Sequence, residues 1–218
     1  MAWKNDQVSA DETKKIVELA EKCLRAEGDF VEMGCYKGDT SLLLAEVLKS
    51  YNRGNSVENP VDKSMDNLWK SGEKVVDKDG GGKLKKRLWI YDSFEGLPEK
   101  SKYDESVLGV DFKGGELTVT KRGVKERFLR AGLPVPVITK AWFSDLTSDD
   151  LPPVISFSFL DGDFYESIRD SLRLVAPKMS KGGVMVIHDY SNPALPGVKK
   201  AVDEWGGAKE GGFKVVLL

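Results

Sequence analysis

The segment Asp29–Ser41 reads DFVEMGCYKGDTS, and its pattern indicates the fold class of this chain. A short apolar run ends in an acid, Glu32, and two glycines follow at Gly34 and Gly38. Apolar residues then recur at helical spacing from Leu42 onward. The order strand, glycine turn, helix is typical of the first βα unit of a doubly wound α/β sheet, in which ligands bind at the carboxyl ends of the strands.

The glycine turn also indicates the kind of ligand. Glycine lets the backbone approach a ligand that a Cβ atom would block. The spacing differs from the G-x-G-x-x-G of dinucleotide sites, and no lysine and serine follow to complete a phosphate loop. The acid Glu32 instead suits a ligand with a positive charge or a free amine, such as the methionine part of S-adenosylmethionine. An ordinary βα turn without a ligand is the alternative at this point.

The charge balance argues against large anionic partners. The 218 residues include 33 basic and 35 acidic side chains, which gives a net charge of -2. No global field therefore draws the chain to nucleic acid or to a membrane surface. No apolar run approaches the ~20 residues of a membrane span, and the first residues, MAWKND, lack the apolar core of a secretory signal. We expect a cytoplasmic protein with no nucleic-acid or membrane partner.

The two cysteines lie in unrelated places, Cys23 in the first expected helix and Cys35 in the glycine turn. Such a pair predicts no disulfide framework and agrees with a reducing interior. Cys35 has no histidine near it in the sequence, so we expect a structural cysteine rather than a reactive thiol.

Helical and strand patterns alternate along the chain, and the first helix begins with a capping box formed by Ser9 and Glu12. This alternation predicts one α/β domain, residues 1–218, with a mostly parallel sheet. Gly182 and Gly183 are expected to open the fifth strand. The expected helices are 9–26, 39–50, 118–131, 165–176 and 196–205, and the expected strands are 29–33, 87–92, 135–139, 154–161, 184–188 and 213–218.

Residues 51–86 interrupt the alternation. Only nine of these 36 residues are apolar, and the stretch ends in DGGGKLKK. We interpret it as a polar, largely solvated insertion of the kind that can be disordered. The basic cluster 83–87 has no interleaved aromatic residue that could stack on bases, so a solvated linker is favoured over a nucleic-acid contact.

Acidic or metal-binding side chains follow four of the expected strands. They are, in chain order, Glu32, Asp92, the pair Asp161 and Asp163, and the pair His188 and Asp189. Because parallel strands present their carboxyl ends at one edge of the sheet, we expect these side chains in one crevice. A single acid at a strand end often caps the next helix. Four such strand ends together favour a functional site.

Two kinds of site follow from these residues. A carboxylate at the end of the second strand, Asp92, suits the hydroxyls of a ribose, and a turn-forming aspartate is the alternative. Oxygen and imidazole donors on the fourth and fifth strands suit Mg²⁺ or another divalent ion, which would hold a substrate hydroxyl and lower its pKa. His188, the only histidine of the chain, is a metal ligand, a base or a structural residue.

Five motifs occur in order along the chain: VEMGCYKGDTS, IYDSFEGLP, FLDGDFYES, GGVMVIHDY and PGVKKAVDEW. Together they resemble the macrocin O-methyltransferase family, within about 29–49, 87–98 and 154–206. Methyltransferases in general share the first motif but not the second or third. The resemblance implies a class I enzyme with a Rossmann-like three-layer sandwich that depends on S-adenosylmethionine and on a divalent metal.

The resemblance also implies roles for individual residues. Glu32, Gly34 and Gly38 line the methionine and ribose side of the cofactor, Asp92 binds the ribose, and Ser93 and Phe94 lie beside the adenosine. The implied cofactor-binding set is completed by Tyr36 and Ser41. The implied metal ligands are Asp161, His188 and Asp189, and the implied catalytic residues are Asp161, His188 and Asp163.

Three features depart from the family pattern. The family usually has two aspartates where this chain has His188 and Asp189, so the identity and affinity of the metal stay open. The insertion 51–86 is not part of the pattern. The chain also stops at Leu218 without the final antiparallel strand of class I, which leaves a sheet edge exposed. A fragment, a homo-oligomer that covers the edge, and an inactive remnant are the three explanations.

The expected reaction is an in-line methyl transfer from the sulfonium of S-adenosylmethionine to a hydroxyl of a sugar or another small molecule. His188 or Asp163 is expected to accept the proton, Tyr165 and Trp142 to line the acceptor pocket, and the segment 97–117 to form a lid. Two alternatives stay open. One is a nucleotide-binding oxidoreductase, against which the glycine spacing argues, and the other is a catalytically silent interaction module.

Overall fold

Parallel strands form the centre of the molecule. The computed structural model describes residues 7–54, 85–106, 108–109, 112–206 and 212–218, and in them the strand order is β3-β2-β1-β4-β5-β6. Every neighbouring pair is parallel, so the carboxyl ends of these strands lie at one edge of the sheet. The strands are β1 Asp29–Met33, β2 Leu88–Asp92, β3 Val137–Lys140, β4 Ile155–Leu160, β5 Met179–Ile187 and β6 Lys214–Leu217.

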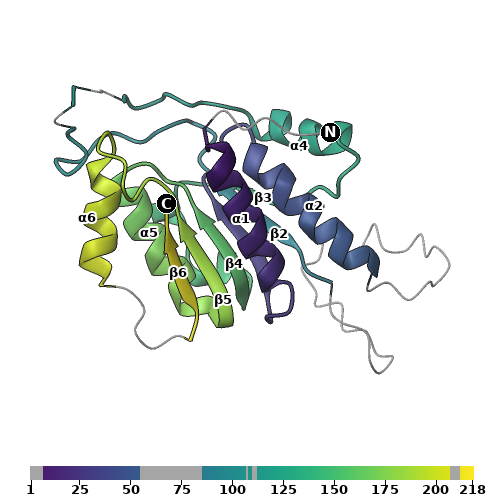
Figure 1. Ribbon diagram of the computed structural model, residues 1–218. Helices are drawn as coiled ribbons and strands as arrows, with labels where there is room; N and C mark the ends of the chain where they lie inside the picture. Colours follow the sequence, from purple (N-terminus) through teal and green to yellow (C-terminus); the bar gives the residue numbers. More distant parts are fainter. Residues whose placement is uncertain (1–6, 55–84, 107, 110–111, 207–211) are drawn as a thin grey trace.

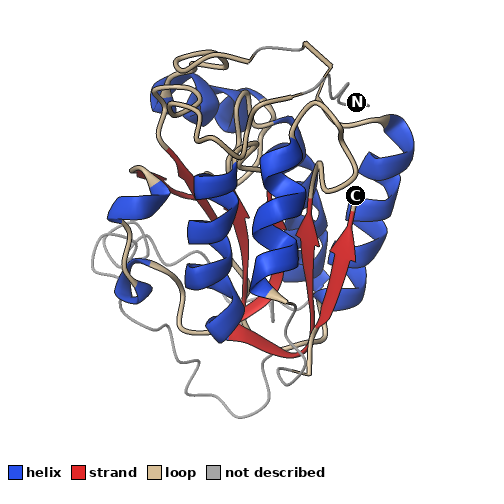
Figure 2. Cartoon of the chain, turned by 90° about the vertical axis from the view of Figure 1, so that its left-hand side faces the viewer, coloured by secondary structure: helices blue, strands red, loops and turns tan. Residues whose placement is uncertain are grey.

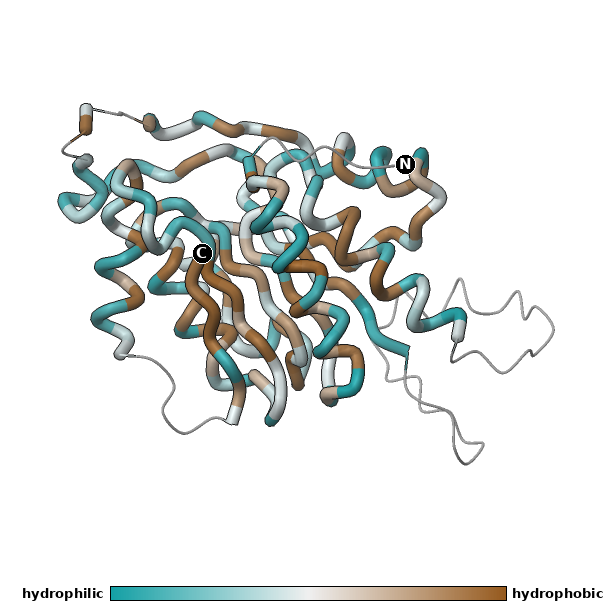
Figure 3. Tube along the Cα trace, viewed as in Figure 1, coloured by the Kyte–Doolittle hydropathy of each residue, from teal (hydrophilic) through white to brown (hydrophobic). Residues whose placement is uncertain are grey.

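Helices cover both faces of this sheet (Figure 1 and Figure 2). Successive strand residues point to opposite faces, so Phe30 joins the core on one side and Val31 the core on the other. The first core is covered by α1 Ala10–Cys23, α2 Asp39–Gly54 and α4 Lys121–Arg130, and the second by α5 Tyr165–Val175 and α6 Pro196–Trp205. Figure 3 shows the apolar strands enclosed by helices whose outer faces are hydrophilic. The predicted three-layer α/β sandwich is confirmed.

The start of α1 confirms the predicted capping box. Ser9 Oγ accepts a hydrogen bond from the Glu12 N–H at 3.3 Å, and Glu12 Oε2 accepts one from the Ser9 N–H at 3.1 Å. The same Glu12 oxygen lies 4.0 Å from His188 Nε2. The capped end of α1 therefore lies beside the carboxyl end of β5.

The fifth strand is longer than predicted. We expected it to begin at Val184, whereas β5 begins at Met179 and contains both Gly182 and Gly183. A Cβ atom at Gly183 would lie 2.7 Å from the carbonyl oxygen of Ser156 in β4, and the register of the two strands shifts nearby. Gly183 thus allows a close approach of two strands, and neither glycine marks the start of one.

Lys86 corrects the interpretation of the basic cluster 83–87 as a solvated linker. Its side chain is buried, and its ammonium donates hydrogen bonds to Ala26 O at 2.5 Å, to Ser156 Oγ at 3.0 Å and to Gly28 O. Burial lowers the pKa of Lys86. This lysine joins the segment after α1 to the start of β4, a contact between distant residues that local sequence does not reveal.

The first residues of the expected insertion are helical, because α2 continues to Gly54, whereas Lys85 and Lys86 at its other end precede β2, which begins at Leu88. Residues 55–84 lie outside the described part of the chain.

The strand near the carboxyl terminus, β6, pairs in parallel with β5, and the described residues include no antiparallel strand. None of the described helices is both long and apolar enough to cross a bilayer.

Candidate active site

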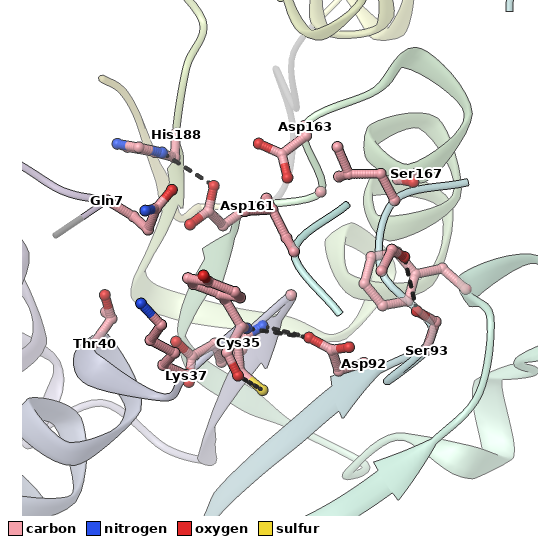
Figure 4. Close-up of a pocket in the computed structure, with 18 of the residues that line it drawn as sticks. Gln7, Cys35, Lys37, Thr40, Asp92, Ser93, Asp161, Asp163, Ser167 and His188 are labelled. Carbon is pink, nitrogen blue, oxygen red and sulfur yellow. Dashed lines mark hydrogen bonds and ion pairs between the residues drawn. The ribbon is translucent and has the colours of Figure 1, made fainter. Parts of the chain in front are cut away.

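The four strand ends singled out in the sequence meet in one pocket at the carboxyl edge of the sheet (Figure 4). The loop between β2 and α4 runs over this edge (Figure 1), and the pocket has one wall from Leu97, Pro98 and Leu117 of that loop. Of the residues predicted for the site, those that line the pocket are Glu32, Gly34, Tyr36, Asp92, Ser93, Asp161, Asp163, His188 and Asp189.

Gly34 is required by the fold itself. Its φ is +88°, and a Cβ atom would lie 2.0 Å from the carbonyl oxygen of Asp161. We expected a ligand to approach this glycine, whereas the group in closest contact is the backbone that follows β4. The glycine thus allows β1 and β4 to end side by side, which brings the first and fourth strand ends together.

Replacing Gly34 by alanine is expected to lower the free energy of unfolding by at least about 2 kcal/mol, because the new methyl group overlaps backbone and the residue has a left-handed φ. Urea unfolding monitored by circular dichroism measures the change. Gly132→Ala is the matched control, since Gly132 also has a positive φ but a Cβ atom there meets nothing within 4 Å. Equal losses in both variants would show that φ alone, and not the contact, is responsible.

Asp92 fixes the glycine turn against the end of β2. Its Oδ2 accepts hydrogen bonds from the N–H groups of Cys35 at 2.8 Å and Tyr36 at 3.2 Å, and its Oδ1 accepts one from the N–H of Phe94 at 2.7 Å. Oδ2 already accepts two hydrogen bonds, whereas Oδ1 keeps one further acceptor site, and the residue lines the pocket. Asp92 is therefore both a structural acceptor for the turn and a carboxylate available to hydroxyl groups.

Glu32 lies at the buried base of the pocket. Its side chain is 1% exposed, and it accepts a short hydrogen bond from Ser41 Oγ. Burial raises the pKa of Glu32 to about 8, although the Ser41 bond lowers it. Ser41 itself does not line the pocket, so its hydroxyl acts on the site by holding Glu32.

The raised pKa of Glu32 predicts a pH-dependent stability. Folded protein keeps a proton that unfolded chain releases between the ordinary pKa of 4.5 and about 8, so the free energy of unfolding falls as pH rises through this interval. For one proton the slope is at most about 1.4 kcal/mol per pH unit. Urea unfolding from pH 5.5 to 7.5 should show this fall in the wild type and a flatter profile in Glu32→Gln, with Glu21→Gln on the exposed face of α1 as control. Parallel profiles for wild type and Glu32→Gln would contradict the assignment.

Three further residues predicted for the pocket lie outside its lining, in addition to Ser41. Phe94, with a φ of +52°, packs into the core under α1, α2 and α4, so its ring does not face the pocket. Gly38 also lies outside the lining, with its φ of +82° at the start of α2. Tyr165 points to the surface, where its hydroxyl donates to Glu204 at 2.6 Å. Trp142, the other expected wall residue, does line the pocket.

Asp161, His188 and Asp189 form a compact cluster. His188 Nδ1 lies 3.0 Å from Asp161 Oδ1 and 2.9 Å from Asp189 Oδ2, and ligand atoms of the three residues lie within 4.8 Å of one another. Burial lowers the pKa of His188, but the hydrogen bonds and charges of the two carboxylates outweigh it and raise the pKa to about 11. The imidazolium thus neutralises part of the acidic charge that the strand ends bring together.

Asp163 is a third acid, beside this cluster (Figure 4). It lines the pocket with a φ of +62°, and burial, together with the charges of Asp161 and Asp189, raises its pKa well above the usual range. Tyr36, Phe94, Asp163 and Asp189 all have positive φ, and all four follow strand ends of the site. Strained backbone of this kind gathers at functional sites.

Sequence reasoning missed part of the lining. Gln7 lies beside Asp161 and His188 although it precedes α1, and Lys37 and Thr40 enter from the turn and the first turn of α2 (Figure 4). Ser167 enters from α5. No local pattern marks Gln7, because its place depends on how α1 packs across the end of β5. Lys37 lies within the first motif, and a charged side chain in a turn that is expected to bind a ligand could have identified it as a lining residue.

Comparison with known proteins identifies the family. The Macrocin-O-methyltransferase (TylF) family model matches residues 67–211, more than half of the chain. The match begins inside the segment 51–86 that we expected to lie outside the family pattern.

Three proteins named as O-methyltransferases are similar to this chain in sequence. One is the 8-demethyl-8-(2,3-dimethoxy-alpha-L-rhamnosyl)-tetracenomycin-C 4'-O-methyltransferase of Streptomyces olivaceus, 28% identical over 83% of this chain and 58% of its own length. The demethyldecarbamoylnovobiocin O-methyltransferase of Streptomyces niveus is 25% identical over 82% of this chain and 58% of its own. The mycinamicin III 3''-O-methyltransferase of Micromonospora griseorubida is 24% identical over 84% of this chain and 78% of its own. The chain thus spans 58% of the length of the first two.

Solved structures agree on the fold. The O-methyltransferase NovP superposes with a TM-score of 0.67 at 23% identity, over 91% of this chain and 72% of that protein. CalS11, the calicheamicin methyltransferase, superposes with a TM-score of 0.64 at 17% identity, over 93% of this chain and 72% of that protein. Fold, motifs and the extent of the family match lead to one conclusion: the chain belongs to the macrocin O-methyltransferase (TylF) family.

Proposed function

We propose that this protein is an S-adenosylmethionine-dependent O-methyltransferase that acts on a hydroxyl of a small molecule, with a sugar or glycoside as the acceptor class. The observation that carries the proposal is the convergence of Glu32, Asp92, Asp161 and His188 from four parallel strands onto one pocket. The family match supports it, as do relatives named for O-methylation of glycosylated natural products. The same relatives do not favour a silent interaction module.

The residues present fit S-adenosylmethionine. The glycine turn lines the pocket with Gly34 and Tyr36, and Asp92 offers a carboxylate at the second strand end, where a ribose is bound in sheets of this type. Glu32 supplies a carboxyl oxygen that accepts a hydrogen bond from the amine of the ligand. When bound, S-adenosylmethionine supplies an electrophilic methyl group on a sulfonium. These residues bind and orient the two reactants so that sulfur, methyl carbon and acceptor oxygen lie in line.

The cluster of Asp161, His188 and Asp189 fits a divalent cation. Two carboxylates and an imidazole within 4.8 Å of one another are a donor set that Mg²⁺ accepts and that Mn²⁺ suits better because of the nitrogen. A bound cation supplies positive charge that lowers the pKa of a hydroxyl. His188 contacts both acids in this structure, so a cation and the proton of His188 compete for them.

We assign the remaining groups of the pocket to binding of the acceptor and to removal of its proton. In the transfer, the oxygen–methyl bond forms as the sulfur–methyl bond breaks, and the hydroxyl proton leaves. Asp163, as a carboxylate beside the cluster, is the proposed acceptor of that proton, because His188 is already engaged by Asp161 and Asp189. Trp142 and Phe143 form an aromatic wall that helps to exclude water from the acceptor side.

Calorimetric titration tests the cofactor site first. S-adenosylhomocysteine should bind with a dissociation constant in the micromolar range, on the order of -8 kcal/mol, and NAD should not bind. Transfer of a labelled methyl group to a panel of sugars and glycosides, with Mn²⁺ and with chelator, then tests the reaction. Binding of NAD but not of S-adenosylhomocysteine by folded protein would favour the oxidoreductase and reject the proposal.

A further inference from the structure

The loop that follows β2 is attached to the helices that cover the second core. Leu97 and Pro98 of this loop line the pocket, and Figure 1 shows the loop running over the carboxyl edge of the sheet toward α6. Ser106 Oγ donates a hydrogen bond to the carbonyl oxygen of Pro193, just before α6, at 3.1 Å. We call residues 97–106 the wall segment, because the first two form a wall of the pocket.

A buried carboxylate, Asp104, lies at the centre of this attachment. The residue is 2% exposed, and its Oδ2 accepts hydrogen bonds from the N–H of Ser101 at 2.9 Å and from Ser101 Oγ at 2.6 Å. Its Oδ1 accepts a hydrogen bond from the N–H of Tyr165, the first residue of α5, at 2.7 Å. One oxygen of the carboxylate therefore shapes the wall segment, and the other joins it to α5.

The first turn of α5 has no side-chain cap of its own. Phe164 occupies the N-cap position, and its side chain has no oxygen that could accept a hydrogen bond from the first N–H groups. Asp104 supplies that acceptor from 61 residues earlier in the chain. Its negative charge also interacts favourably with the partial positive charge at the start of the helix. The start of α5 and the wall segment thus depend on the same carboxylate.

The start of α6 closes around the same oxygen. A Cβ atom at Gly197, the second residue of α6, would overlap Asp104 Oδ1 and would lie 2.9 Å from the backbone nitrogen of Tyr165. The φ of Gly197 is not positive, so its backbone conformation does not require glycine. The close approach of the carboxylate does require it. The wall segment, α5 and α6 therefore meet at Asp104 Oδ1.

From these contacts we infer that Asp104 is a positioning residue that clamps the wall segment against α5 and α6 and thereby holds one wall of the pocket in place. The inference rests on the proposed function for the ligand that the pocket holds. Surface segments open locally at a rate and to an extent set by their contacts, and such opening can control how fast a bound ligand leaves. With the clamp in place the wall stays closed and a bound ligand leaves slowly.

Two measurements on the full chain test the clamp. Hydrogen exchange of a peptide that covers residues 99–106 reports opening of the wall segment, and surface plasmon resonance reports the dissociation rate of S-adenosylhomocysteine. Asp104→Ala should raise both rates about tenfold, because three hydrogen bonds to a carboxylate are lost. The association rate should stay within about threefold.

Two further variants of the wall segment grade this effect. Asp104→Asn keeps an oxygen that can cap α5 but places an amide group against the donors of Ser101, so both rates should rise by less than in Asp104→Ala. Glu105→Ala is the matched control, because this neighbouring acid is exposed, and it should change neither rate.

Gly197→Ala keeps the carboxylate and disturbs its seat from the side of α6. In the otherwise wild-type chain it should raise exchange of 99–106 and ligand dissociation about tenfold. Combined with Asp104→Ala it should add no more than about threefold, because the overlap with Oδ1 is then gone and only the contact with the Tyr165 nitrogen remains.

Three results would overturn the inference and leave the proposed function intact. The first is wild-type exchange of 99–106 in both Asp104→Ala and Gly197→Ala. The second is faster exchange with unchanged dissociation of S-adenosylhomocysteine. The third is exchange that rises equally throughout the chain, which would show a general loss of stability. A folded wild type that does not bind S-adenosylhomocysteine would instead reject the proposed function, while exchange of 99–106 would still decide whether Asp104 clamps the wall segment.

Discussion

Asp92→Ala is expected to weaken binding of S-adenosylhomocysteine by about 100-fold, since it removes both the carboxylate proposed for the ribose and the acceptor that shapes the glycine turn. Three N–H groups, those of Cys35, Tyr36 and Phe94, lose their acceptor in this variant. Calorimetric titration measures the affinity, and urea unfolding measures how much of the loss comes from the fold.

Asp92→Asn separates the two contributions. The amide keeps one acceptor oxygen for the turn but places donors where the ribose hydroxyls would donate, so affinity should still fall by about tenfold while the fold is largely retained. Asp149→Ala, an exposed acid outside the pocket, is the matched control. Unchanged affinity in both Asp92 variants would assign this aspartate to the turn alone.

Asp161→Asn and Asp189→Asn are expected to lower the affinity for Mn²⁺ by about 10- to 100-fold, because each removes one anionic ligand from a three-residue cluster. Electron paramagnetic resonance of free Mn²⁺ measures binding without any need for an acceptor. Affinity for S-adenosylhomocysteine should stay within about threefold, because neither side chain is proposed to touch the methionine or the ribose.

The control for this pair is Asp203→Asn, an acid on α6 that pairs with Lys199 at the surface. It should bind Mn²⁺ as the wild type does. In labelled methyl transfer, the two cluster variants with Mn²⁺ should be no faster than the wild type with chelator. Full turnover of the wild type in chelator, or Mn²⁺ binding that neither substitution affects, would reject the metal site.

Local sequence patterns predicted the order of strands and helices along the chain and the positions of the acids that follow the strands. Glu32, Asp92, Asp161 and His188 each follow an apolar run of strand length, and each run is followed by helical spacing or a turn. Such patterns are local and depend on which residues face the core. The rule that parallel strands end at one edge then predicted that these side chains share a pocket, and the structure confirms it.

Predictions from local sequence pattern were wrong where a contact joins residues that are far apart in the chain. Gly182 and Gly183 were expected to open a strand, but they lie within it, and at Gly183 β4 passes too close for a side chain. Lys86 resembled its solvated neighbours, yet it is buried against the carbonyl oxygens of Ala26 and Gly28. Phe94 follows a strand end as a ligand-contacting residue does, but its positive φ turns the ring into the core.

The interactions between the site residues depend on the assembled fold. His188 lies between two carboxylates that come from different strands, and their charge raises its pKa to about 11. Glu32 has a pKa of about 8 because α2 and the neighbouring strands bury it. The periodicity of apolar residues in the sequence indicates which side of a helix or strand faces the core. Interactions between charges and the desolvation of a side chain depend instead on distances between residues of different strands, which are set only when the sheet is assembled.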